Sequence, residues 1–301
     1  MKRATLMGTL MSIGLAWPIF AGALESQLKV LKEYKSLYRN VTVVESSNRR
    51  CVRLLNKKNP YNSQSCLLLN DHKQLLFFYS QAMLAALTTQ SDGFKVLSVG
   101  LGGGTMPNAI RDYFPNADIT TVELDPKMLL AAQEFMYFKE DDKNTVVVQD
   151  ARYFIRKEKV RKAQYDVVLL DAFNGEYIPE HLTTQEFLQE VKAILKPEGM
   201  VLSNTFSHKD FFHSESVTYD SVFPGFCAFS AAGVRTIVAY KDSACQLEPI
   251  AASITKHADR LKPYIPRPLS FVRLLSNDKN WDKEARIFTD QFSPANIYNV
   301  D

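Results

Sequence analysis

Three carboxylates and one glycine-rich turn have the residue types and spacing that chemistry at a ligand site needs. Glu123, Asp150 and Asp171 each follow an apolar segment typical of a central strand. In open sheets of alternating strands and helices, ligands bind beyond the carboxyl ends of the strands. Each acid alone could instead cap a helix. As a set beside the glycine turn, the three acids predict a ligand site at the carboxyl edge of a parallel sheet.

The glycine-rich turn lies between an apolar strand, residues 96–99, and a predicted helix. Its glycines are Gly100, Gly102, Gly103 and Gly104. Glycine lets the backbone turn sharply and approach a ligand without a Cβ, and the helix N-terminus directs unpaired N–H groups to the same place. Glu123 follows Gly102 by 21 positions, where a Rossmann-type unit places a carboxylate for ribose hydroxyls. The alternative is a tight turn with an incidental acid, but the complete order of elements favours a nucleoside site.

The elements that position these residues alternate along the chain. After Glu123, the pattern predicts helices and strands in turn: helix 126–137, strand 145–148, helix 151–157, strand 165–170, helix 184–195 and strand 200–203. Such alternation is typical of an α/β, doubly wound, mostly parallel sheet covered on both faces. Residues 225–230 and 234–240 read as a hairpin that forms an antiparallel edge of that sheet.

The segment before the glycine turn is predicted to carry a small N-terminal β element. Helical apolar spacing predicts a leading helix over residues 24–38. Strands are expected at 41–45, 51–55 and 66–69, and a long helix at 72–87. We therefore expect residues 24–90 to precede a Rossmann-like nucleoside-binding domain at residues 91–301.

Residues 1–23 have the pattern of a secretory signal peptide. Lys2 and Arg3 precede a mostly apolar run, and the small residues at 21–23 suit cleavage after Ala23. Cleavage would export the chain to the periplasm or outside the cell and leave no stable membrane span; the alternative is an uncleaved N-terminal anchor. The formal net charge of +3 is too small to indicate nucleic-acid binding.

Four cysteines follow the signal: Cys51, Cys66, Cys227 and Cys245. An even number in an exported chain favours disulfides. The lack of a C-x-x-C pair or a neighbouring histidine argues against zinc. The simplest pairing joins the first two and the last two cysteines, because each pair brackets a strand–turn–strand pattern. The other two connectivities remain open, as do four buried thiols.

The motifs GLGGGT, VELDP, QDAR and YDVVLLDAF, in this order, resemble the spermidine synthase (polyamine aminopropyltransferase) superfamily. That superfamily is a branch of the class I S-adenosylmethionine-dependent fold. Fainter likenesses occur in SLYRNVTVVE, FFYSQAM and EARIFTDQFSPAN, so the resemblance spans most of the mature chain. It implies a decarboxylated S-adenosylmethionine or S-adenosylmethionine donor, an amine substrate, no metal, and a possible homodimer.

Carried over by motif, the resemblance implies a role for each acid. Glu123 would bind the ribose hydroxyls, and Asp150 with the backbone of Ala151 would hold the adenine amine. Asp171 matches the proton acceptor, which the chemistry requires because a protonated amine has no lone pair for attack. Tyr79 and Tyr177 are weaker substrate-site candidates; packing is as good a reading for Tyr177. His181 lies in the same loop, where histidines are more often solvated than catalytic.

The sequence departs from the superfamily at the amine end of the site. Gly103 stands where the family has an aspartate for the aminopropyl amine, and Asn174 replaces a second aspartate. Ser80 replaces a histidine beside Tyr79, and Arg39 replaces a glutamine. Charged hydrogen bonds of this kind are worth roughly 1.5–3 kcal/mol each. The nucleoside half of the site is therefore expected to survive better than the polyamine half.

Three hypotheses follow. The first is a spermidine-synthase-like transferase with a degenerate polyamine site. The second is a methyltransferase of the same fold. The third is an exported, non-catalytic binding or scaffold protein, because a fold alone does not fix a reaction.

Overall fold

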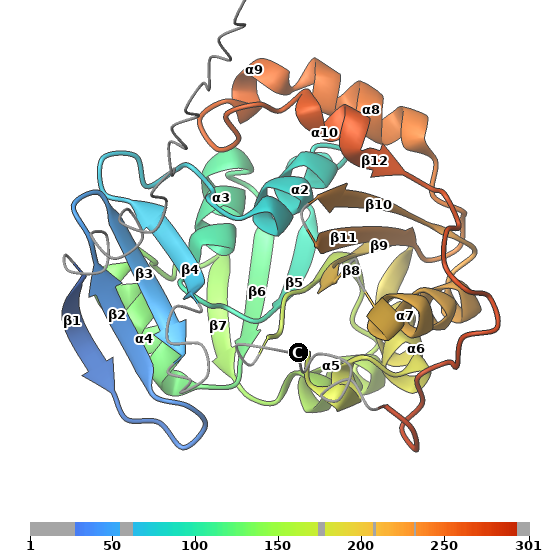
Figure 1. Ribbon diagram of the computed structural model, residues 1–301, viewed down its shortest axis with the longest axis horizontal. Helices are drawn as coiled ribbons and strands as arrows, with labels where there is room; N and C mark the ends of the chain where they lie inside the picture. The colour runs from blue at the N-terminus through green and yellow to red at the C-terminus, as the bar shows by residue number, and fades with distance from the viewer. Residues whose placement is uncertain (1–27, 55–62, 174–177, 207–208, 232, 294–301) are drawn as a thin grey trace, which may run out of the picture.

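The protein is seen in a computed structural model that describes residues 28–54, 63–173, 178–206, 209–231 and 233–293. An eight-stranded sheet forms the centre of the molecule, and a four-stranded sheet lies at one side of it (Figure 1). The strands are β1 (Lys29–Tyr34), β2 (Val41–Glu45), β3 (Arg49–Leu54), β4 (Ser63–Leu68), β5 (Lys95–Val99), β6 (Asp118–Glu123), β7 (Asn144–Val148), β8 (Tyr165–Leu170), β9 (Leu195–Phe206), β10 (Phe226–Ala231), β11 (Val234–Tyr240) and β12 (Leu275–Ser276).

The helices alternate with the central strands in the first part of the large sheet and then follow its antiparallel end. They are α2 (Phe78–Leu87), α3 (Thr105–Tyr113), α4 (Pro126–Phe135), α5 (Ala151–Val160), the 3₁₀ helix η1 (Glu180–Leu182), α6 (Gln185–Ala193), α7 (Lys209–Val222), α8 (Leu247–Lys256), α9 (Ala258–Leu261) and α10 (Ser270–Leu274).

The large sheet has the order β12-β10-β11-β9-β8-β5-β6-β7. Its strands β5 to β9 are parallel, whereas β11 pairs antiparallel with β9 and β10 antiparallel with β11. The predicted α/β, doubly wound, mostly parallel fold is confirmed, and so is the antiparallel hairpin. The short strand β12 extends the sheet beyond that hairpin.

Alternating apolar residues bury both faces of the central strands. On β5, Val96 belongs to the core beneath α2, α3, α8 and α10, whereas Leu97 faces α5, α6 and α7 on the other side. Figure 1 shows these helices as two layers, one above and one below the sheet in that view. Because both faces are covered, bound molecules reach the parallel strands only at their ends.

The small sheet has the order β1-β2-β3-β4 and packs against α4. The prediction of a helix over residues 24–38 is wrong, because residues 29–34 form strand β1. A register shift between Val30 and Lys32 leaves Leu31 as an extra residue. That bulge places Leu31 and Tyr34 in the same core although they are three positions apart. Because of this bulge, the core residues of the strand are spaced three positions apart, as they would be in a helix.

Helix α2 begins at Phe78, so the predicted helix over residues 72–87 is too long at its start. The preceding chain is held by tertiary contacts instead: the Leu75 N–H donates to the Tyr264 carbonyl, and its carbonyl accepts from Gln81 Nε2. Tyr79 therefore lies in the first turn of α2, and most of the following turns are buried.

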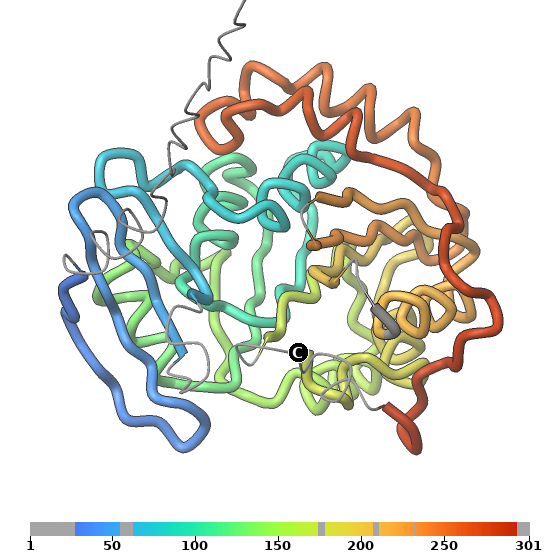
Figure 2. The backbone as a smooth tube through the Cα atoms, viewed as in Figure 1, coloured from blue at the N-terminus to red at the C-terminus, as the bar shows by residue number. Residues whose placement is uncertain are grey.

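The C-terminal part of the chain leaves β12 and passes α7 toward α5 and α6 (Figure 2). Phe288 is fully buried there and packs with Phe211 and Ile178. The backbone N–H of Gln185 donates to the Phe288 carbonyl at 2.8 Å. Residues 285–293 thus line the same side of the molecule as α6. Within the ranges that the structure describes, no helix has both the length and the apolar character needed to cross a membrane.

Two disulfides join the four cysteines in the simplest of the predicted pairings. Cys51 and Cys66 face each other across β3 and β4 and are bonded. Cys227, on β10, is bonded to Cys245 after β11. Both bonds are buried, with exposed fractions of 5% or less.

Replacing Cys227 and Cys245 together by serine should lower the free energy of unfolding by about 3 kcal/mol, because the bond closes a loop in the unfolded chain. Urea unfolding of the wild type and of this double variant, both without reductant, measures the loss. The Cys51→Ser, Cys66→Ser double variant tests the other bond in the same way. Finding four alkylatable thiols in the native, non-reduced protein by mass spectrometry would contradict both bonds.

Candidate functional site

A cavity of about 270 Å³ opens at the carboxyl ends of the central strands. The glycine turn, the loops after β6, β7 and β8, and residues 38–39, 54 and 63–64 of the small sheet form its walls. Glu123, Asp150 and Asp171 all line it, as do Gly100, Gly102, Ala151, Tyr79 and His181. The structure therefore brings the three predicted acids together around one space.

The glycine turn is packed directly against the end of β8. A Cβ on Gly100 would lie 2.3 Å from the carbonyl oxygen of Asp171, and the backbone there has a φ of +96°. The Gly100 N–H donates to the Val122 carbonyl at 2.8 Å, and the Asp171 N–H donates to the Val99 carbonyl at 2.9 Å. Only glycine fits this close approach, which fixes the turn beside the proposed proton acceptor.

Glu123 ends β6, and its carboxylate holds the glycine turn through one oxygen and the start of α4 through the other. Its Oε2 accepts the Leu101 N–H and its Oε1 accepts the Asp125 N–H, each at 2.9 Å. Burial, together with the charge of Asp125, raises the pKa of this carboxyl, and the backbone N–H groups of Asp125, Leu101 and Leu124 partly oppose the rise. Each carboxylate oxygen has a second lone pair. Both can therefore still accept ribose hydroxyls, so the residue fits its predicted role.

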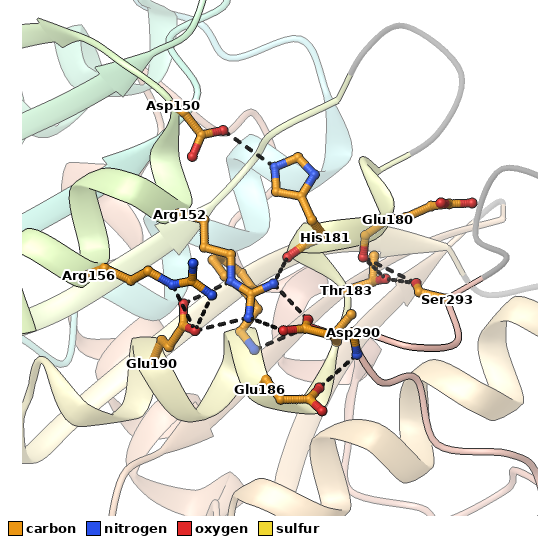
Figure 3. Close-up of polar contacts among 12 residues, drawn as sticks. Asp150, Arg152, Arg156, Glu180, His181, Thr183, Glu186, Glu190, Asp290 and Ser293 are labelled. Carbon is orange, nitrogen blue, oxygen red and sulfur yellow. Dashed lines mark hydrogen bonds and ion pairs between the residues drawn. The ribbon is translucent and has the colours of Figure 1, made fainter.

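Asp150 is the N-cap of α5, and its Oδ1 accepts the Tyr153 N–H at 2.8 Å. Its Oδ2 lies 3.5 Å from His181 Nε2 (Figure 3). Next to it, Gln149 also lines the cavity, and its buried Oε1 has no hydrogen-bond partner within the described part of the chain. Buried oxygens without partners are costly. A ligand that offers N–H groups at this edge, as an adenine amine does, would satisfy it.

Asp171 follows β8 and is held between two other elements. Asn204 Nδ2, on β9, donates to Asp171 Oδ1 at 2.9 Å, and the Tyr79 hydroxyl, on α2, donates to the same carboxylate. Burial raises the pKa of Asp171 to about 7, and the charge of Glu123 adds to the rise. The two hydrogen bonds lower the pKa but do not cancel the effect of burial. A carboxylate with this pKa can take a proton near neutral pH.

Gly103, which stands where the resembled superfamily has an aspartate for the aminopropyl amine, is closely surrounded. A Cβ on Gly103 would lie 2.8 Å from Ser65 Oγ and 2.9 Å from Met136 Cε. Ser65 Oγ is also 3.1 Å from Thr105 Oγ1. The space that an acidic side chain at position 103 would need is thus already filled. Arg39 brings a cation to the cavity wall instead.

Several predicted positions contribute less or fall outside this description. Gly103 and Gly104 shape the turn but do not line the cavity. Asn174 and Tyr177 lie outside the described residues. No group of three or more histidine, cysteine or acidic side chains able to hold a metal occurs among the described residues.

Asn204 and Gln149 are the site residues that the sequence analysis missed. Asn204 could have been found as a polar residue near the end of the next central strand, by the reasoning that found the acids. Gln149 directly precedes Asp150 in the QDAR motif. Its importance depends on an unsatisfied oxygen, which only packing reveals.

Residues 76–242 match the model of the spermine/spermidine synthase domain. A polyamine aminopropyltransferase of Vibrio vulnificus is 35% identical over 275 residues, which are 90% of this chain and 92% of that protein. This chain belongs to the spermine/spermidine synthase family. A probable spermidine synthase from Corynebacterium glutamicum shares the fold, with a TM-score of 0.66 at 19% identity, over 88% of this chain and 98% of that one.

A second relative is named as a methyltransferase. The eEF1A lysine and N-terminal methyltransferase of Bos taurus is 38% identical over 149 residues, which are 44% of this chain and 21% of that protein. The match therefore concerns only part of that protein.

The raised pKa of Asp171 predicts a pH-dependent stability. In the unfolded chain this carboxyl ionises near 3.8, whereas in the folded chain it does so near 7. Between these values the folded state binds more protons, so stability falls as the pH rises. The free energy of unfolding of Asp171→Asn, minus that of the wild type, should therefore increase from about pH 4 to about pH 7 and stay level above pH 7. Urea unfolding at a series of pH values measures the difference. A difference that stays constant with pH would contradict the assigned pKa.

Proposed function

We propose that this protein transfers an aminopropyl group from an adenosyl-sulfonium donor to a small primary amine. The observation that carries the proposal is Asp171, a buried carboxylate that shares one cavity with the nucleoside acids Glu123 and Asp150. Membership of the spermine/spermidine synthase family and the name of the Vibrio vulnificus relative support the same chemistry.

Each group has one task in this reaction. Glu123 and Asp150 hold the nucleoside, while the glycine turn leaves room for the donor beside them. The amine nitrogen forms a bond to the carbon next to the sulfonium, and the electron pair of the broken C–S bond stays on sulfur. Asp171 takes the proton that the amine nitrogen loses. Tyr79 and Asn204 orient its carboxylate and stay bonded to it when it is charged.

Methyl transfer from S-adenosylmethionine is the second candidate function. Its support is Gly103, whose surroundings leave no space for the acid that would hold an aminopropyl amine. The positive Arg39 on the cavity wall is also better suited to a donor with a carboxylate than to one without. The bovine methyltransferase relative adds to this alternative.

Calorimetry with S-adenosylmethionine, decarboxylated S-adenosylmethionine and methylthioadenosine distinguishes these functions. Aminopropyl transfer predicts that the decarboxylated donor binds more tightly than S-adenosylmethionine, whereas methyl transfer predicts the reverse order. Failure of all three to bind would contradict both functions and favour a non-catalytic protein.

Once an amine that supports turnover is found, Asp171→Asn should abolish transfer because the proton acceptor is lost. The affinity of this variant for methylthioadenosine should stay within about twofold of the wild type, since the replaced carboxylate is separate from the ribose and adenine contacts. Release of methylthioadenosine is the assay for aminopropyl transfer. A variant that turns over at the wild-type rate would exclude Asp171 as the base.

We also propose that the chain is exported after cleavage following Ala23. The two disulfides support an oxidising location. N-terminal sequencing of the protein from its own cells should start at Leu24; a chain that retains residues 1–23 would favour the membrane-anchored alternative.

A further inference from the structure

Arg152 is a buried cation that lies two positions after the adenine-site acid Asp150 and takes no part in the proposed chemistry. Its side chain is 8% exposed. It donates to both oxygens of Glu190, at 2.9 Å each, and to both oxygens of Asp290, at 2.7 and 2.8 Å (Figure 3). Bidentate hydrogen bonds between a guanidinium and a carboxylate fix the orientation of both groups in addition to pairing their charges. Arg152 therefore joins α5, α6 and the C-terminal segment rigidly.

The same guanidinium also holds the segment that carries His181, residues 178–184, which includes η1 and is called the loop below. Arg152 Nη1 donates to the His181 carbonyl oxygen at 3.1 Å. The imidazole of that residue points toward Asp150, with its Nε2 3.5 Å from Asp150 Oδ2 (Figure 3). Pro179, His181 and Leu182 line the cavity. The cation thus sets the position of one wall of the nucleoside site through a backbone contact.

The C-terminal segment holds the same loop at three further points. Ser293 Oγ donates to the Glu180 carbonyl at 3.2 Å and lies 2.7 Å from Thr183 Oγ1. Thr184 Oγ1 donates to Asp290 Oδ1 at 2.7 Å. These contacts bracket η1 on both sides, so the loop cannot move away without breaking them.

An apolar contact supports the polar ones. Phe288 is fully buried and packs with Ile178 and the partly buried Leu182. Leu182 belongs both to this cluster and to the wall of the cavity. Residues 285–293 therefore contact the loop without lining the cavity.

We propose that the C-terminal segment, residues 285–293, is a positioning element for the adenine end of the site. Asp290 and Ser293, acting through Arg152 and η1, hold His181 beside Asp150 and keep the carboxylate aimed at the exocyclic amine of adenine. The inference rests on the proposed nucleoside function. Neither Asp290 nor Arg152 touches the cavity, so both are positioning residues.

Asp290→Asn tests this with little change of shape. The amide can still accept from Thr184, but it loses the charge that opposes Arg152. Affinity for methylthioadenosine should fall by roughly tenfold, within the range seen for residues that act on a site without touching its ligand. The matched control is Asp220→Asn on α7, which likewise removes an ion pair, in this case with Lys279. The Asp220 side chain is 32% exposed and that of Asp290 is 39% exposed, so the two substitutions are alike in burial.

A second ligand separates positioning from general destabilisation. Methylthioinosine has a carbonyl in place of the adenine amine, so Asp150 should reject it. If the C-terminal segment keeps Asp150 correctly placed, Asp290→Asn should lower the preference for methylthioadenosine over methylthioinosine several-fold. Asp220→Asn should preserve that preference, even if the two variants melt at equally reduced temperatures without ligand.

The outcomes of this calorimetry are distinct. Equal affinities and equal preferences in the two variants would overturn the positioning role and leave the proposed function standing. A wild-type protein that binds neither nucleoside would overturn the proposed function, and the positioning role with it.

Discussion

The close contact between Gly100 and the Asp171 backbone is the constraint on which the site depends. Any Cβ at position 100 would collide with the Asp171 carbonyl at 2.3 Å. The contact sets the glycine turn against the end of β8, while backbone hydrogen bonds tie the same residues to β5 and β6. The backbone alone therefore fixes Asp171, the proposed proton acceptor, relative to the glycine turn and to the end of β6, where Glu123 lies.

The cavity wall carries both buried carboxyl groups and a cation. Burial disfavours the charged forms of Glu123 and Asp171, and each has hydrogen-bond donors that offset this. Outside the cavity lining, Ser65 and Met136 crowd position 103, while Arg39 adds a cation to the cavity wall itself. The acids proposed to hold an adenosyl group line the cavity, whereas the position that the family resemblance assigns to an aminopropyl-binding aspartate is Gly103. Retention of the family's fold is therefore compatible with a different donor or acceptor.

Much of the fold and the centre of the site could be predicted from the sequence, because both depend on local pattern. Apolar runs ending in an acid identified Glu123, Asp150 and Asp171, since the topology of a parallel sheet gathers strand ends at one edge. Strand β1 was misread because a bulge at Leu31 replaced the two-residue period with a spacing of three. The true start of α2 depends on a backbone contact with Tyr264, which is 189 positions from Leu75 and leaves no local signal.

The supporting contacts were beyond local pattern for the same reason. Asp290 meets Arg152 across 138 positions of sequence, and Asn204 meets Asp171 across 33. Asp290 carries no local signal, and the position of Asn204 near a strand end does not indicate its partner. Their significance comes from the partners that folding brings to them, and the same holds for the buried Oε1 of Gln149.

The central claim is that the cavity at the carboxyl edge is an adenosyl site. A crystal structure of the protein grown with methylthioadenosine tests it most directly. We expect ribose hydroxyls on the Glu123 carboxylate, the adenine amine on Asp150, and the thioether sulfur turned toward Asp171. A nucleoside bound elsewhere, or in this cavity with its adenine away from Asp150, would contradict it.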